Sequence, residues 1–140
     1  MDGVEMSFEM LDDGIIKVPN PTGDVYILAA TARGCAFDND MTARWREVEA
    51  CQHRDAMQGY MNTYAQLKPE PKNKFDPKAI EILARGEFFG HMGYIAKEQT
   101  DAVRRLAKYA GCDLKDIAIQ VACSEDVGFK SVRLALIASA

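Results

Sequence analysis

An aromatic residue, a carboxylate and a proline stand together at Phe75-Asp76-Pro77, inside the lysine-bearing run EPKNKFDPKAIEIL (70–83). An Asp before Pro favours extended or turn backbone, and its carboxylate can accept N–H groups one or two residues further on. Asp76 therefore either shapes the corner before the apolar run, or faces outward and accepts a hydrogen bond from a ligand. Because a carboxylate repels phosphate, such a ligand would offer a hydroxyl or an amino group here.

Three aromatic residues lie beside turn glycines or at this corner: Phe75, Tyr94 after Gly93, and Phe129 after Gly128. Each has two interpretations. A single aromatic side chain of this kind most often packs into the core. If it is exposed, it becomes a platform for a nucleic-acid base, worth about 1–3 kcal/mol per base.

Three basic residues are candidates for an anion site. Lys97 is the first cation of an expected helix, and helix N-termini favour phosphate through free N–H groups and the helix dipole. Arg54 and Lys68 are long enough to reach a phosphate, although a solvated surface position is the simpler explanation for each of them.

Catalytic and cofactor motifs are missing from the sequence. It contains no GxxxxGK[ST], GxGxxG, GxSxG or HExxH, and neither histidine stands near a Ser or Cys in a nucleophile arrangement. We therefore expect no enzyme activity and no cofactor.

The four cysteines, Cys35, Cys51, Cys112 and Cys123, form no CxxC pair, so we expect free thiols and no metal site, with Cys123 in the core. A cysteine–histidine site using His53 or His91 would have to assemble from separate segments.

The charge is distributed unevenly along the chain. The 140 residues fit one domain, and their net charge of −4 owes most to residues 1–24, which carry six acids and one lysine. Residues 68–108 carry nine Lys or Arg against six acids. This mild basic bias suits a small anion or a short nucleic-acid end rather than a long duplex, and it equally fits an ordinary solvated surface.

Targeting signals are also missing. No apolar run approaches the roughly 20 residues that a membrane-spanning helix needs, and the acidic start has no basic region followed by an apolar block. We expect a cytoplasmic protein with no membrane association.

Hydrophobic periodicity predicts many short strands and two helices, which is a mainly β, α+β chain. The expected strands cover 4–11, 15–19, 25–32, 59–71, 79–86, 88–95, 116–123 and 129–138. The expected helices cover 38–57, with Asp40 as N-cap, and 97–111, ended by a left-handed Gly111. On the first helix one face should carry Met41, Trp45, Val48 and Gln52, with Trp45 and Val48 anchoring it to the core. On the second, one apolar stripe should consist of Ala102 or Val103, Leu106, Ala107 and Ala110.

The order of these elements lacks regular β–α alternation, so a parallel doubly wound sheet is not expected. It predicts a small curled or closed antiparallel sheet flanked by helices. Residues 1–24 would be an acidic extension, with two short strands packed on a domain of residues 25–140.

Taken in order, these signals resemble the signature of the HIRAN domain family over residues 67–107. The matching residues are Glu70, Pro71, Asn73, Phe75, Asp76, Ala79, Ile80, Gly93, Tyr94, Lys97 and Glu98. The resemblance implies a compact OB-like antiparallel β-barrel that captures the 3′ end of single-stranded DNA. It implies that Asp76 accepts the terminal hydroxyl, that Phe75, Tyr94 and Phe129 hold the last nucleotides, and that Lys97 meets a phosphate.

The same resemblance implies a role in DNA repair or processing beside a helicase or nuclease. Lys74 replaces a usual proline, and the arginine–tyrosine pair that serves DNA in the family has only Arg54 or Tyr60 as candidates. The residues leave two other functions open beside DNA binding. One is an assembly module whose N-terminal strands pair with another chain, and the other is a hydrolase that uses Asp76.

Overall fold

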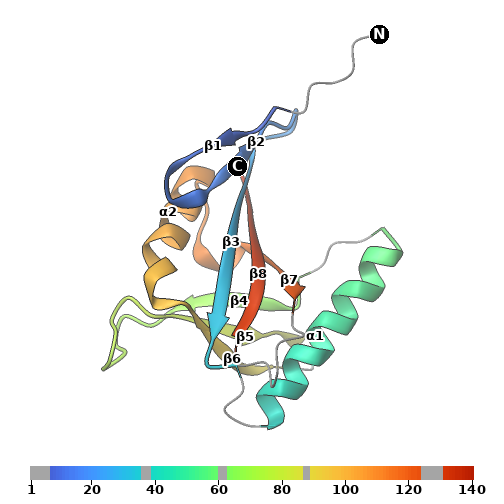
Figure 1. The fold of residues 1–140 in the computed structure, drawn as a ribbon, viewed down its shortest axis with the longest axis vertical. Coiled ribbons are helices and arrows are strands. Elements are labelled where there is room, and N and C mark those ends of the chain that lie inside the picture. The colour runs from blue at the N-terminus through green and yellow to red at the C-terminus, as the bar shows by residue number, and fades with distance from the viewer. Residues whose placement is uncertain (1–6, 36–38, 60–62, 87–88, 124–130) are drawn as a thin grey trace.

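The chain folds as a mixed α+β structure in a computed structural model that describes residues 7–35, 39–59, 63–86, 89–123 and 131–140 (Figure 1). The described part contains eight strands and two helices. The strands are β1 (Glu9–Met10), β2 (Ile16–Val18), β3 (Val25–Arg33), β4 (Ala65–Pro69), β5 (Ile80–Ala84), β6 (Gly90–Ile95), β7 (Ala118–Cys123) and β8 (Ser131–Ser139). The helices are α1 (Asn39–Met57) and α2 (Thr100–Ala110). A strand or helix therefore forms in each expected segment, and within the described residues most strands are shorter than expected.

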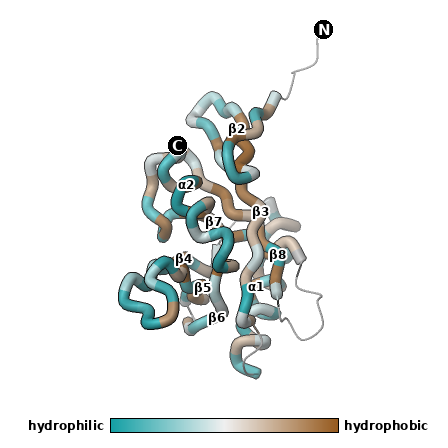
Figure 2. The backbone as a smooth tube through the Cα atoms, turned by 60° about the vertical axis from the view of Figure 1, so that its left-hand side comes forward, coloured by the Kyte–Doolittle hydropathy of each residue, from teal (hydrophilic) through white to brown (hydrophobic). Residues whose placement is uncertain are grey.

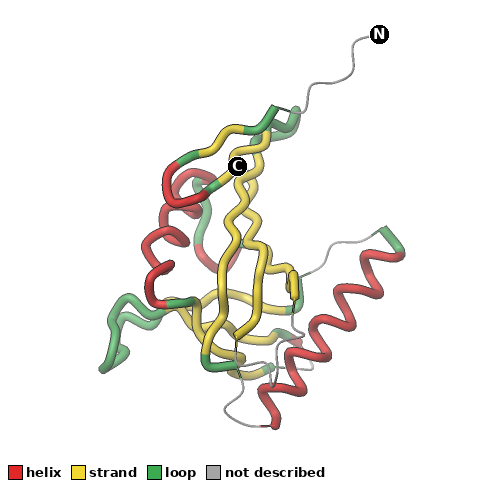
Figure 3. The backbone as a smooth tube through the Cα atoms, in the orientation of Figure 1, coloured by secondary structure: helices red, strands yellow, loops and turns green. Residues whose placement is uncertain are grey.

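All strand pairs are antiparallel, and β3 is the branching strand because it pairs with β2, β6 and β8. β3 and β8 stay in register from Val25 opposite Ser139 to Arg33 opposite Ser131. β3 meets β6 only at its end, through Ala32 and Arg33. Figures 1 and 3 show the result: β4, β5 and β6 lie across one end of the long β3–β8 ribbon.

The expected closed sheet does not form by strand pairing. Among the described residues β1 pairs only with β2, β4 only with β5, and β7 only with β8, so each of these outer strands has one edge without a strand partner. What the structure shows is an open, bent antiparallel sheet with two helices, which is the coarser part of the expectation.

Side chains, rather than a neighbouring strand, form hydrogen bonds with backbone groups on the outer edge of β7. Gln52 of α1 donates to the carbonyl of Ile119 at 2.8 Å and accepts the N–H of Val121 at 2.9 Å. The hydroxyl of Thr63 accepts the N–H of Ile119 at 3.1 Å. Gln52 is buried on the same helix face as Trp45 and Val48, and its amide gives these backbone groups the partners that they require.

The helices cover the sheet with the faces that the sequence predicts. Trp45 and Val48 of α1 are fully buried, and the Trp45 indole donates to the Met92 carbonyl of β6 at 2.7 Å. Leu106 and Val103 of α2 are also fully buried. Figure 2 shows the apolar colour concentrated along β2, β3 and β8, whereas the loop beside β4 is hydrophilic.

The helix ends differ in detail from the prediction. α1 begins at Asn39, so Asp40 lies in its first turn and is not the N-cap. The 97–111 segment opens with a 3₁₀ turn at Lys97–Gln99, and α2 starts at Thr100. Gly111 ends α2 with φ +71°, as expected for the left-handed cap.

The N-terminal segment joins the sheet. β1 and β2 form the expected pair of short strands, with Asp13 left-handed in the turn, and β2 continues the sheet at β3. An ion pair between Arg105 and Asp13 connects this hairpin to α2. Neither helix in the described ranges combines the length and the apolar character needed to cross a membrane.

Candidate nucleic-acid interface

The corner that connects β4 to β5 is held by a dense set of local hydrogen bonds. The N–H of Glu70 donates to the carbonyl of Ala79, and the N–H of Ala79 donates to the carbonyl of Asp76, both at 3.0 Å. The side-chain oxygen of Asn73 accepts the N–H groups of Phe75 and Asp76 at 2.9 and 3.0 Å. Asn73 is therefore the organiser of this corner and fixes where Phe75 and Asp76 stand.

Asp76 has the turn-shaping role that the sequence predicts as one of its two interpretations. Its Oδ1 accepts the backbone N–H of Lys78 at 2.9 Å. Among the described residues no hydrogen bond engages Oδ2, and Asp76 is only half-buried at the edge of a hollow. The carboxylate can thus cap the turn with one oxygen and keep the other for a ligand.

Phe75 is not a core residue. Its side chain is 95% exposed, the highest fraction among the large apolar residues of the described structure. An aromatic ring held fully in solvent by a hydrogen-bonded corner loses apolar contact that folding normally provides. Its exposure therefore favours the stacking interpretation over core packing.

Tyr94 stands on β6, opposite Glu81 of β5 and Arg33 of β3. It is half-buried, and this burial, together with its hydrogen bond to Glu70 and the nearby carboxylates, raises the pKa of Tyr94 to about 12. The Asn73 amide donates a hydrogen bond to the Glu70 carboxylate at 3.0 Å. This hydrogen bond, and a second one from Tyr94, lower the pKa of the Glu70 carboxyl. The tyrosine is therefore neutral and the glutamate charged near neutral pH.

His91 extends this network across the sheet. Its Nδ1 lies 2.6 Å from Oε2 of the buried Glu81, and its ring meets the Tyr94 ring edge-on at 5.0 Å. The Tyr94 ring is therefore positioned from two sides, by Glu70 at its hydroxyl and by His91 at its edge.

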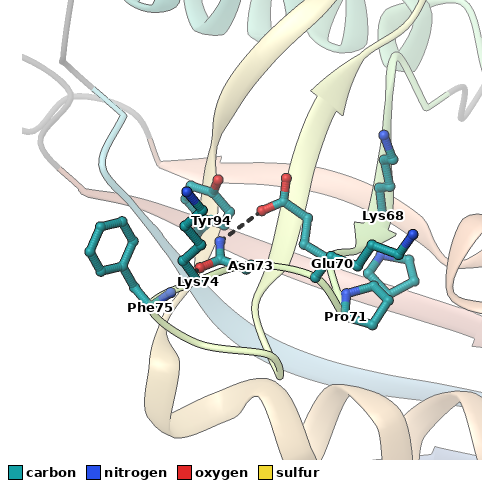
Figure 4. A pocket seen from close by; sticks show the side chains of 9 residues that line it. Lys68, Glu70, Pro71, Asn73, Lys74, Phe75 and Tyr94 are labelled. Atoms are coloured by element: carbon teal, nitrogen blue, oxygen red, sulfur yellow. Dashed lines mark hydrogen bonds between the residues drawn. The ribbon is translucent and has the colours of Figure 1, made fainter.

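Two hollows share the wall formed by Asn73, Phe75 and Tyr94. The first, called here the Asp76 hollow, has a volume of about 390 Å³ and is lined by Arg33, Gly34, Asn73, Phe75, Asp76, Ala79, Tyr94, Ile95 and Lys97. The second, called the lysine groove, has a volume of about 580 Å³ and is lined by residues 68–75 and Tyr94 (Figure 4). Phe75, Asp76, Tyr94 and Lys97 are thus brought together, and Lys68 lies in the adjoining groove.

Arg33 also lines the Asp76 hollow, although the sequence did not single it out as a candidate. Cross-strand neighbours place Lys68, Glu81, Tyr94 and Arg33 in one row over β4, β5, β6 and β3. Directly opposed residues of antiparallel strands share a face, so these side chains belong to one surface. The position of Arg33 at the end of an alternating strand, just before Gly34, was the available signal.

The Arg33 guanidinium is already occupied by a carboxylate. Its two terminal nitrogens lie 2.7 and 2.6 Å from the two oxygens of Glu98, and both side chains are exposed. This bond is the main reason that the pKa of the Glu98 carboxyl is lowered. The geometry is the two-pronged one that arginine also offers to phosphate.

One of the expected site residues does not belong to this surface. Arg54 lies on α1, exposed beside Asp55, and it lines neither hollow. Phe129 lies outside the described residues, as does Tyr60, so the structure places neither of them.

The described thiols line neither hollow. Cys35 and Cys51 are buried, Cys112 is half-buried, and no disulfide joins these three. Burial raises the pKa of the Cys35 thiol to about 12, which keeps it protonated. No group of three His, Cys, Asp or Glu side chains gathers as metal ligands within the described ranges.

Comparison with known proteins gives no relative. The chain matches no protein-family model, no curated protein and no solved structure.

The raised pKa of Tyr94 predicts a loss of stability in alkali. The folded state holds the phenolic proton more tightly than the unfolded chain, whose tyrosines titrate near 10. The stabilisation is complete below about pH 10 and is lost as the pH rises toward 12. Urea unfolding should give a lower free energy of unfolding at about pH 11 than at about pH 8. This decrease should be smaller in Tyr94→Phe than in the parent protein. An equal decline in both proteins would contradict the assigned pKa.

Proposed function

We propose that this chain is a non-enzymatic HIRAN-like module, with an OB-like arrangement of its bent sheet, that binds the 3′-hydroxyl end of single-stranded DNA. The observation that carries the proposal is the convergence of exposed Phe75, half-buried Tyr94, Asp76 and Lys97 at one hollow. These residues come from the β4–β5 corner, from β6 and from the turn before α2. Together they provide a stacking surface, a hydroxyl acceptor and a cation.

Each group has a distinct chemical task in this proposal. The carboxylate of Asp76 accepts a hydrogen bond from the terminal 3′-hydroxyl, a group that exists only at a chain end. The Phe75 ring stacks on a base, and the same stacking serves every base because each has a π-face. Lys97, which has no acidic partner among the described residues, neutralises a phosphate.

Arg33 takes the place of the arginine for which Arg54 was the candidate. It lines the Asp76 hollow between Tyr94 and Lys97. A phosphate would compete with Glu98 for its guanidinium, so binding at this position is weakened by the resident ion pair. The proposal therefore assigns most of the end recognition to Asp76 and the aromatic residues.

The first test compares the two chemical forms of a DNA 3′ end. Anisotropy of a short labelled single strand should show tighter binding with a 3′-hydroxyl than with a 3′-phosphate. Asp76→Asn keeps an oxygen that can accept the N–H of Lys78, so the turn survives while the negative charge is lost. A hydrogen bond to a charged group is worth about 1.5–3 kcal/mol, so the preference should fall by about ten-fold or more.

A second variant separates stacking from folding. Phe75→Ala should leave the midpoint of thermal unfolding unchanged, because the ring is 95% exposed. It should weaken DNA binding by about 1–3 kcal/mol, the value of one base stacked on an aromatic ring. Equal binding to both 3′ ends, with neither variant changing it, would refute the proposal.

One observation favours a second function, that of an assembly module. β1 pairs only with β2 among the described residues, and Phe8 and Met10 beside this edge are 64% and 60% exposed. An edge with exposed apolar side chains can pair with a strand of another chain, such as a helicase or nuclease partner. Failure of every single strand to bind at low salt would leave this function in place of the first.

A further inference from the structure

Cations without an acidic partner gather in the lysine groove. Within the described ranges Lys72 and Lys74 have no carboxylate in ion-pair distance, whereas Lys17 and Lys78 pair with acids at 3.5 and 3.4 Å. Lys68 joins them from β4, and all three side chains are exposed. Positive charge that has no partner inside the protein is available to an anionic ligand.

Glu70 is the only acid among the described residues that line the groove, and it is already engaged. It accepts the amide of Asn73 at 3.0 Å and a hydrogen bond from Tyr94, and nearby Lys68 adds to the lowering of its pKa. Figure 4 shows its carboxylate turned toward Asn73 and Tyr94, with Lys68 on the other side. One glutamate committed to the corner leaves the charge of three lysines incompletely balanced.

The groove is continuous with the Asp76 hollow. The two share Asn73, Phe75 and Tyr94, so a chain whose end lies at Asp76 reaches the groove by passing the Phe75 ring. Pro69 and Pro71 restrict the backbone where the lysines begin, and the hydrogen bonds of Asn73 fix its other end. The lysines are therefore presented by a preorganised corner rather than by a loose loop.

We propose that the lysine groove is a second subsite, which binds the phosphodiester backbone of the nucleotides that precede the 3′-terminal one. The inference rests on the proposed function and adds the path of the strand to it. Lysines act as point charges, so this subsite reads no sequence and no end. The Asp76 hollow selects the end, and the groove supplies affinity that grows with strand length and falls with salt.

The test compares two strand lengths in the full chain. Oligothymidylates of two and eight nucleotides, each with a 5′ label and a 3′-hydroxyl, are titrated by anisotropy at several salt concentrations. Lys72→Gln combined with Lys74→Gln should weaken binding of the longer strand by about ten-fold. The slope of log affinity against log salt concentration should become shallower by about 1.4, because each lost phosphate contact contributes about 0.7. Binding of the dinucleotide and the preference for a 3′-hydroxyl should not change.

Lys108→Gln is the matched control, because Lys108 lies in the last turn of α2, at the end away from the corner (Figure 1). It should change neither strand's affinity. Equal affinity for the two strand lengths, or an equal loss of affinity for both strands in the double variant, would overturn the subsite. A preference for the 3′-hydroxyl retained in that case would still uphold the proposed function. Lysine-dependent binding without end preference would uphold the groove and overturn end recognition. No binding of either strand overturns both.

Discussion

Gly93→Ala is expected to destabilise the chain by about 3 kcal/mol or more, the combined cost of backbone strain and overpacking. Gly93 has φ +138°, a conformation that is essentially restricted to glycine. A Cβ there would lie 2.7 Å from the carbonyl oxygen of Arg33 and 3.0 Å from the Cys35 sulfur. The oxygen belongs to the backbone of β3, so the β3–β6 junction itself would have to move.

The substitution should also disturb the candidate site, because Gly93 precedes Tyr94 and the added carbon would clash with the backbone of Arg33. Urea unfolding followed by circular dichroism measures the loss. Gly111→Ala is the matched control, since Gly111 also has positive φ, +71°, but has open space around the added carbon. It should cost about 1 kcal/mol, the usual penalty of the left-handed region alone. Equal losses in the two variants would show that the close approach at Gly93 is unimportant.

Trp45→Phe is expected to cost about 2–4 kcal/mol, from lost volume in the core and from an unpaired buried carbonyl. The indole is fully buried and donates to the Met92 carbonyl at 2.7 Å, a bond that joins α1 to β6. Phenylalanine fills part of the space but has no donor, so the carbonyl of Met92 would lose its partner.

Circular dichroism is the appropriate probe for this variant, because Trp45 is the single tryptophan and its fluorescence is lost. Met57→Ala provides the comparison on the same helix, because the Met57 side chain at the end of α1 is 78% exposed. This variant should change the free energy of unfolding by less than about 0.5 kcal/mol. A Trp45→Phe protein as stable as the parent would mean that the indole does not anchor α1 to the sheet.

Local patterns predicted the elements because they depend on nearby residues. The alternation in Val25–Arg33 and the stripe of Thr100–Ala110 each appear within one segment, and both elements form. Pro, Gly and Asn similarly marked the turns, including the corner at Asp76. Asp40 was misassigned because an N-cap depends on where the first helical residue lies, a boundary that sequence patterns locate only approximately.

The candidate site was predicted only in part. The resemblance over residues 67–107 implied that Phe75, Asp76, Tyr94 and Lys97 act together, and the structure brings these four residues to one hollow. Arg33 was missed because it comes from a strand some sixty residues earlier, and only the pairing of β3 with β6 places it opposite Tyr94. Arg54, chosen for its charge alone, lies on another element.

The sequence by itself determined the mixed composition of strands and helices, the buried helix faces and the chemistry available at the corner. These follow from periodicity, turn residues and residue type, which are local properties. Only the tertiary structure decided that Phe75 is exposed, that Arg33 pairs with Glu98 and that Gln52 satisfies the edge of β7. Exposure and pairing depend on strand register and on how the sheet bends, which arise from contacts between residues distant in the chain.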